Sequence, residues 1–295
     1  MPLPFLGGHE VAGDIVALGP GANRKIWKEG QRVAVRMLYS CGECYNCRTG
    51  HTNMCTQAQR KPVREGMIPG PGGLCDQIVV STKDLFLIPD GISYEEASLT
   101  EPLACCVHSI EIGDIQLGDD VVVIGGGIMG INHVILAKRK GAGVIISEVD
   151  EERRKLALSL GADVAINPME CDVVEKVKEL TGGRGADVVF NTTAIPSVVP
   201  EAIAMTGSFG KMVQYSSMHP DAPVPVSPQM LHSTQKILTG SISPTEIDFF
   251  RANRLISSGI VDMKSLIAAT FPFEKAQDAF EKAIVPGTYR VIIKG

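Results

Sequence analysis

The sequence lacks any hydrophobic run long enough to cross a membrane. Its longest nearly apolar stretch is residues 121–131, whereas a membrane-spanning helix needs about 20 apolar residues. No block of Lys or Arg stands out and the net charge is -5, so neither nucleic acid nor a membrane surface is an expected partner. The first residues contain no basic region and no cleavage-like site, so we expect no signal peptide and a cytoplasmic protein.

The remaining composition is that of a globular protein. Of 295 residues, 44% are hydrophobic and 21% are charged, and a chain of this length favours two domains. Eight cysteines without an export signal indicate a reducing compartment, where clustered thiols more often hold a metal than form disulfides.

The pattern Gly125-x-Gly127-x-x-Gly130 follows the β-branched run 121–124 and precedes a predicted helix over residues 131–140. A buried strand, a tight glycine turn and a helix N-terminus in this order are typical of a dinucleotide-binding motif, in which backbone N–H groups bind the pyrophosphate. Taken alone the glycine pattern is a weak signal, because glycine-rich turns are common.

The next predicted strand, residues 144–147, strengthens this interpretation because it ends at Glu148, 23 residues after Gly125. An acidic residue at about this distance binds the ribose hydroxyls of NAD and disfavours the phosphate of NADP. The alternative is a solvated charge at the start of the acidic run 150–152. Arg153, on the following helix, could reach back to the phosphate of NADP. The predicted NAD-binding residues are Gly125, Gly127, Ile128, Met129, Gly130, Glu148 and Arg153.

Four cysteines fall within 15 residues, in the spacing C-x2-C-x2-C-x7-C. They are Cys41, Cys44, Cys47 and Cys55. Four thiolates on a compact loop favour a tetrahedral structural zinc, which leaves no position for a substrate. An iron–sulfur cluster and ordinary structural thiols are the alternatives, but the bacterial ferredoxin run has a shorter last spacing. The other cysteines are scattered and are predicted to be buried small hydrophobic residues.

The pattern of secondary structure changes along the chain. Residues 1–100 are predicted to be mostly β, with strands at 11–18, 31–36, 75–80 and 84–88. Residues 101–244 alternate strands with helices, as in a doubly wound parallel sheet. The predicted strands there are 121–124, 144–147, 163–166, 187–191, 211–215 and 236–240, and the helices are 131–140, 151–160, 172–180 and 197–205. Residues 245–295 are predicted to hold helices near 246–257 and 273–284 and a strand at 289–293.

With these motifs the chain resembles the zinc-containing medium-chain alcohol and polyol dehydrogenases, especially the sorbitol, threonine and butanediol dehydrogenase branch. The resemblance rests on Gly8-His9-Glu10, the four-cysteine lobe, Glu101-Pro102-Leu103, the glycine fingerprint and the ending 271–276 with 287–291. It implies an α/β fold: a Rossmann domain at residues 101–244 and a β-rich GroES-like catalytic domain made of 1–100 and 245–295. A homo-oligomer, dimer or tetramer, is also implied.

The resemblance further implies a catalytic zinc separate from the lobe zinc. His9 would be a ligand, Glu10 a ligand or close neighbour, and Glu101 a carboxylate at the metal or at its bound water. The implied reaction is the reversible oxidation of a secondary alcohol or polyol, with NAD accepting the hydride.

One feature departs from the family. Its first catalytic ligand is a cysteine upstream of Gly-His-Glu, and only seven residues precede Gly8 here. We therefore expect either a fragment or mis-started version of a longer protein, or a natural truncation with an impaired catalytic site. The alternative function is a non-catalytic zinc- and nucleotide-binding protein.

Overall fold

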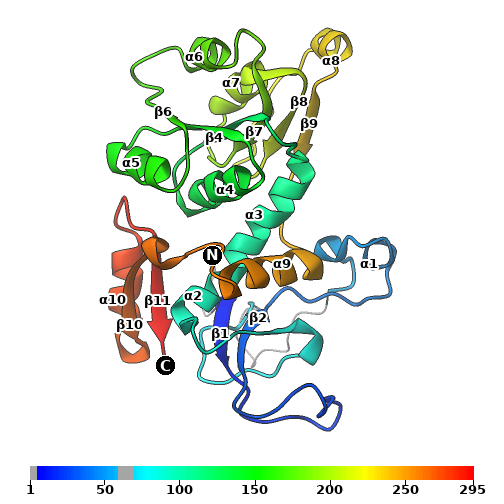
Figure 1. The fold of residues 1–295 in the computed structure, drawn as a ribbon. Coiled ribbons are helices and arrows are strands. Elements are labelled where there is room, and N and C mark those ends of the chain that lie inside the picture. Colours follow the sequence, from blue (N-terminus) through cyan, green and yellow to red (C-terminus); the bar gives the residue numbers. More distant parts are fainter. Residues whose placement is uncertain (1–4, 59–69) are drawn as a thin grey trace. The chain divides into compact units, whose positions relative to one another are not determined.

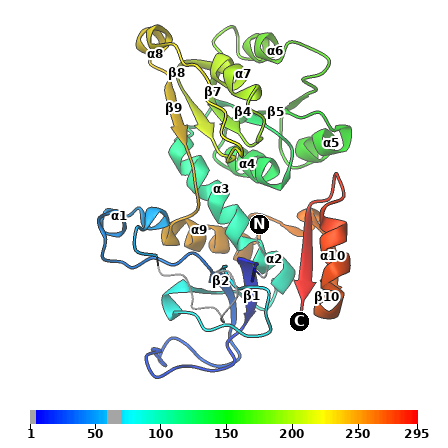
Figure 2. The same ribbon diagram turned by 180° about the vertical axis from the view of Figure 1, so that it is seen from behind.

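The computed structural model describes residues 5–58 and 70–295 (Figures 1 and 2). The chain divides into two compact units. The first unit comprises Met1–Cys105 and Ser243–Gly295, and the second comprises Cys106–Ile242. None of the helices in the described part of the chain combines the length and the apolar character that a bilayer crossing requires.

The second unit is built on a six-stranded parallel sheet with the order β6-β5-β4-β7-β8-β9. Its strands are β4 (Asp120–Ile124), β5 (Gly143–Ser147), β6 (Val164–Ile166), β7 (Ala186–Asn191), β8 (Thr206–Gln214) and β9 (Ile237–Gly240). The strand order reverses at β4, which has β5 on one side and β7 on the other. Ligands of doubly wound sheets bind at the carboxyl ends of the strands at such a switch point. The predicted Rossmann fold class is confirmed.

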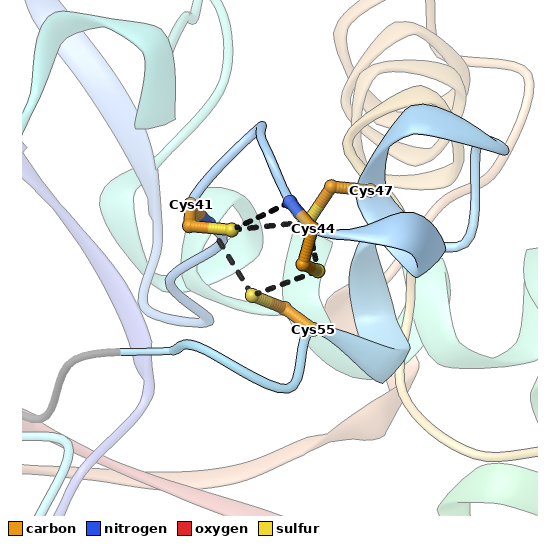
Figure 3. A group of neighbouring side chains, drawn as sticks. All are labelled: Cys41, Cys44, Cys47 and Cys55. Atoms are coloured by element: carbon orange, nitrogen blue, oxygen red, sulfur yellow. Dashed lines mark hydrogen bonds between the residues drawn. The ribbon is translucent and has the colours of Figure 1, made fainter.

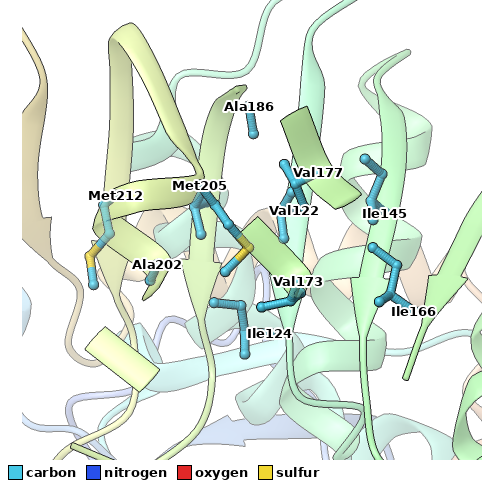
Figure 4. Packing of buried hydrophobic residues seen from close by; sticks show 11 residues of the cluster. Val122, Ile124, Ile145, Ile166, Val173, Val177, Ala186, Ala202, Met205 and Met212 are labelled. Carbon is cyan, nitrogen blue, oxygen red and sulfur yellow. The ribbon is translucent and has the colours of Figure 1, made fainter. Parts of the chain in front are cut away.

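Helices cover both faces of this sheet. They are α4 (Ile128–Arg139), α5 (Glu151–Ser159), α6 (Val173–Leu180) and α7 (Val198–Met205). Figures 1 and 2 show α4 and α5 on one face and α6 and α7 on the other. Apolar side chains of α6 and α7 pack onto the strands in one buried cluster (Figure 4). The β-branched strand residues therefore occupy the two-sided core that their unbroken hydrophobicity predicts.

Helix starts in this unit follow the side chains that can cap them. Asp150 accepts a hydrogen bond from the N–H of Arg153 at the start of α5, and Asp172 accepts two at the start of α6. Such caps satisfy N–H groups that the helix leaves unpaired. Helix α4 differs, because its N-cap is Gly127, which has no side chain to accept a hydrogen bond from the first turn. Its first N–H groups can therefore bind a ligand.

The first unit contains two small sheets. Strands β1 (Glu10–Asp14), β2 (Arg32–Arg36) and β3 (Leu85–Leu87) form an antiparallel sheet, and β10 (Ile267–Pro272) and β11 (Arg290–Lys294) form a parallel pair. Its helices are α1 (Tyr45–Arg48), α2 (Tyr94–Ser98), α9 (Glu246–Ser257) and α10 (Ala276–Ala283), with 3-10 turns η1 (Thr52–Met54), η2 (Thr82–Asp84), η3 (Lys264–Leu266) and η4 (Phe273–Lys275). Helix α3 (Thr100–Gly113) continues from this unit into the second.

The predicted strand at residues 75–80 is wrong, since the segment forms no strand. Ile78 and Val80 do pack against the small core around Val33 and Val35. The alternation of apolar and polar residues here therefore reflects burial without strand pairing. The Cys75 thiol donates to the nearby carbonyl oxygens of Gly72 and Gln77.

The elements that were not predicted include α3, α8 (Pro228–Thr234) and β10. Helix α3 is buried on most of its surface, so its sequence shows little of the apolar and polar alternation that identifies a surface helix.

Candidate metal and nucleotide sites

The four cysteines of the lobe converge on one point (Figure 3). Cys44 and Cys47 lie at α1, and Cys55 follows η1. Their ligand atoms lie within 4.8 Å of one another, with Sγ–Sγ distances of 3.5 Å for Cys44–Cys47 and 3.9 Å for both Cys41–Cys47 and Cys44–Cys55. Four Zn–S bonds of ~2.3 Å in a tetrahedron place the sulfurs ~3.8 Å apart. The arrangement fits one tetrahedral zinc ion.

The backbone of the lobe prepares the sulfurs for a cation. The N–H groups of Glu43 and Cys44 donate to Cys41 Sγ, and the N–H of Cys41 donates to Cys55 Sγ. The backbone N–H of Cys47 is the main cause that lowers the pKa of Cys44 to about 5, whereas burial raises the pKa of the Cys47 thiol to about 12. Because zinc binds thiolates, metal binding must release a proton from Cys47.

A buried charge cluster holds both ends of the lobe. Glu246, the first residue of α9, accepts hydrogen bonds from Ser40 Oγ at 2.6 Å, from Arg36 Nη2 at 2.8 Å and from Thr52 Oγ1. Ser40 directly precedes Cys41, and Thr52 lies on η1 just before Cys55. Arg36 is fully buried and also pairs with Asp84 at 2.6 Å. The lobe is thereby joined to β2 and α9.

A second cluster brings together His9, Glu10 and Glu101, whose ligand atoms also lie within 4.8 Å of one another. Glu10 begins β1, and Glu101 lies in the first turn of α3. His9 Nε2 is 3.8 Å from Glu101 Oε2. One imidazole and two carboxylates are a donor set that suits zinc with an open coordination position.

Glycine backbones fix the Gly-His-Glu segment. Gly8 has a φ of +85°, and a Cβ added to it would lie 2.7 Å from the backbone nitrogen of Leu74. The N–H of Leu74 donates to the Gly7 carbonyl, and the N–H of Gly73 donates to that of Gly8. Only glycine fits this close approach, so residues 72–74 set the backbone from which His9 projects.

The electrostatics of this cluster favour a cation. Glu101 is only 14% exposed, and burial is the main cause that raises its pKa above the ordinary value. The nearby His9 opposes this shift, and the negative charge of Glu10 adds to it. Arg290 of β11 pairs with Glu10. A pocket of about 710 Å³ lies beside the cluster and is lined by His9, Glu10 and Arg290, among others.

The glycine fingerprint forms the turn from β4 into α4. Gly125 has a φ of +97°, and a Cβ on Gly130 would lie 1.8 Å from the Gly125 carbonyl oxygen. At Gly127 an added Cβ would meet nothing within 4 Å, so space for a ligand is open where the backbone must approach it. Ile128 and Met129 form the first turn of α4. The loop and the uncapped helix therefore fit a pyrophosphate.

Glu148 follows β5 and lies against this loop. Its Oε2 accepts the N–H of Gly126, its Oε1 accepts the N–H of Asp150 at 2.8 Å, and the residue is only 6% exposed. Arg153 lies close by, since a Cβ on Gly126 would be 3.2 Å from that of Arg153. Arg154 instead donates to the backbone carbonyls of Glu148 and Val149.

His133 contacts the first turn of α4, which directly follows the glycine turn, and it was not predicted as functional. Its Nδ1 lies 2.7 Å from the Met129 carbonyl oxygen and therefore donates, while Nε2 accepts from Ser109 Oγ at 2.8 Å. The ring packs at 4.8 Å against both Phe190 and Tyr215. Burial lowers the pKa of His133 to about 4, so the imidazole is neutral near pH 7.

Known proteins agree with this combination of sites. Residues 129–258 match the family model of zinc-binding dehydrogenases, and residues 1–90 match that of the alcohol dehydrogenase GroES-like domain. The chain belongs to the zinc-binding dehydrogenase family. Sorbitol dehydrogenase of Bacillus subtilis is 32% identical over 287 residues, which are 95% of this chain and 78% of that protein.

Two solved structures extend the comparison. A protein of Sinorhizobium meliloti described as a zinc-binding dehydrogenase and bound to NADP has a TM-score of 0.88 and 26% identity, covering 98% of this chain and 83% of its own. The 2R,3R-butanediol dehydrogenase of Bacillus subtilis has a TM-score of 0.84 and 26% identity, and the match covers 98% of this chain and 80% of that chain.

The protein is therefore a zinc-dependent oxidoreductase that uses NAD and acts on the CH–OH group of an alcohol or polyol. The relatives are named as dehydrogenases, which supports the catalytic prediction over the alternative of a non-catalytic binding protein.

Proposed function

We propose that His9, Glu10 and Glu101 hold the catalytic zinc and that the enzyme oxidises a secondary alcohol group of a polyol to a ketone. The observation that carries the proposal is the convergence of these three ligand side chains, two of them about 90 residues from the third, within 4.8 Å. The four-cysteine lobe takes the structural zinc. Its closed set of thiolates leaves no open position, so the substrate belongs at the His9 cluster.

In this reaction the alcohol carbon loses a hydride to NAD, and the hydroxyl group loses a proton. When bound, zinc supplies a Lewis acid that stabilises the negative charge on the alcohol oxygen. His9 offers a ring nitrogen to the metal. Arg290 holds the Glu10 carboxylate, and Glu101, whose pKa is raised by burial, is placed to accept or return a proton.

NAD is held in the second unit by the Gly125–Gly130 turn and the first turn of α4. Glu148 accepts the adenosine ribose hydroxyls, and its charge disfavours the phosphate that NADP carries there. Arg153 lies near enough to the loop to reduce this penalty. We expect NAD to be preferred, because Glu148 is held by two backbone N–H groups directly beside the turn.

Relatives suggest which substrates to test first. They include proteins named for sorbitol, D-arabitol phosphate, L-threonine and 2R,3R-butanediol. The proposal predicts NAD reduction by at least one polyol or diol, and a large loss of turnover in His9→Ala with NAD affinity unchanged. Turnover that survives this substitution would contradict the assignment of the metal site. His51→Ala, which alters an exposed histidine outside the cluster, is the control.

We also propose a cytoplasmic homo-oligomer, a dimer or tetramer. The eight cysteines all lie in the described part of the chain and form no disulfide bond there, which suits a reducing compartment. Strand β9 lies at the edge of the six-stranded sheet and exposes Ile237, and edge strands with exposed apolar side chains favour association. Light scattering of the purified protein measures the assembly directly, and a strictly monomeric mass would contradict the proposal.

A further inference from the structure

The two oxygens of the Glu101 carboxylate have different neighbours. Oε2 faces Nε2 of His9 at 3.8 Å. Oε1 accepts a hydrogen bond from the Cys105 thiol, with Sγ 3.4 Å away. Cys105 lies four residues beyond Glu101 on α3, and this spacing places both side chains on one face of the helix. The pairing is therefore built into a single rigid element.

This contact controls how the carboxylate is presented. The terminal torsion of a glutamate is broad and nearly two-fold, so an unrestrained Glu101 would exchange its two oxygens freely. A thiol is a weak donor, but an ionised acceptor strengthens a hydrogen bond, and little water reaches a carboxylate that is 14% exposed. A donor on Oε1 keeps Oε2 directed at the His9 cluster.

The thiol itself lies outside that cluster. The group whose ligand atoms all fall within 4.8 Å of one another consists of His9, Glu10 and Glu101 and does not include Cys105. Within the first unit the thiol donates to Glu101 Oε1, the carboxylate oxygen that does not face His9. This arrangement is that of a group that orients a ligand, and such groups commonly affect metal affinity by about 10–100-fold.

We propose that Cys105 is a positioning residue for the catalytic metal site, which it orders by holding Glu101 Oε1. The inference rests on the proposed function of the His9 cluster. The inference predicts that the metal affinity of the His9 cluster depends on the hydrogen bond to Glu101 and not on the sulfur atom itself. A serine at this position keeps a donor one helical turn from Glu101, whereas an alanine removes it.

The test uses protein that retains zinc in the cysteine lobe and is titrated with Co²⁺, whose visible absorption reports binding at the His9 cluster. We expect Cys105→Ala to weaken Co²⁺ binding by about 10-fold or more and Cys105→Ser to restore it to within about threefold of the wild type. Cys171→Ala removes an exposed thiol far from the cluster in sequence and should change nothing. Lobe zinc, NAD affinity and melting temperature should be alike in all four proteins.

Three results would overturn the inference, and they are distinguishable. Equal Co²⁺ affinity in Cys105→Ala and the wild type would remove the positioning role but leave the metal site intact. A sulfur-to-cobalt charge-transfer band that disappears in both Cys105 variants would make the thiol a direct ligand. Failure of the wild type to bind Co²⁺ outside the lobe would contradict the proposed metal site itself, and this inference with it.

Discussion

Replacing Glu148 by serine is expected to weaken NAD binding and to bring the affinities for NAD and NADP closer together. In the folded protein both carboxylate oxygens are held by backbone N–H groups, and the residue is 6% exposed. The charge is therefore fixed beside the glycine turn, where water screens it only weakly. Serine removes the charge and the acceptors for the ribose hydroxyls.

The magnitude follows from the charges involved. Two unit charges about 4 Å apart repel by roughly 4 kcal/mol at an effective dielectric of ~20. At about 1.4 kcal/mol per tenfold change in affinity, this allows discrimination of up to two or three orders of magnitude against NADP. A hydrogen bond to a charged group contributes about 1.5–3 kcal/mol, so the loss of one ribose contact should weaken NAD binding by about 10–100-fold.

Isothermal titration of both nucleotides into both proteins measures the four affinities. Glu152→Ser is the matched control, because it removes the same charge one residue before Arg153 from a side chain that is 81% exposed. The ratio of affinities should stay at the wild-type value in this control. Equal binding of NAD and NADP by the wild type, or an unchanged ratio in Glu148→Ser, would show that the Glu148 carboxylate does not set the nucleotide preference.

Three further predictions concern metal content and stability. Cys47→Ser should release the tightly bound zinc and destabilise the first unit, whereas Cys171→Ser should not; elemental analysis that finds zinc retained in Cys47→Ser would contradict the lobe assignment. Glu246→Gln should lower the free energy of unfolding by about 2 kcal/mol, because Arg36 loses one of its two charged partners in a buried site. A change below about 0.5 kcal/mol in urea unfolding would show that the buried charge cluster around Arg36 does not stabilise the lobe. The pKa of His133 is 6.5 in the unfolded chain and about 4 in the folded protein. Its contribution to the free energy of unfolding is therefore complete above pH 6.5 and decreases by about 3 kcal/mol as the pH falls to 4. The difference between the wild type and His133→Phe should shrink across that range, and a difference independent of pH would show that the histidine is not buried neutral.

The second unit was largely predictable because its signals are local. Most of its strands are short runs of β-branched or apolar residues, and Asp150 and Asp172 mark where α5 and α6 begin. The first unit was harder to predict. Residues 75–80 alternate like a strand but find no pairing partner in the described structure, and α3 has too little exposed surface to produce a clear helical period.

The sites divide in the same way. The cysteine lobe and the glycine fingerprint are each contained in 15 residues or fewer of sequence. The cysteine spacing predicts the lobe by itself, and the glycine pattern predicts a nucleotide site together with its flanking strands and Glu148. His9 and Glu101 were linked only through a family resemblance. Nothing local indicates that Arg290 pairs with Glu10, or that Glu246 reaches Arg36 and both ends of the lobe. These contacts join residues some 200 or more positions apart, and only the folded chain brings them together.

We conclude that this protein moves a hydride from an alcohol carbon to NAD. The most direct measurement uses a polyol or diol that the enzyme oxidises, deuterated at the reacting carbinol carbon, followed by mass spectrometry of the reduced nucleotide. We expect the NADH formed to carry one deuterium and the product to be the corresponding ketone. Reduced nucleotide without deuterium, or oxidation of the alcohol without reduction of NAD, would contradict it.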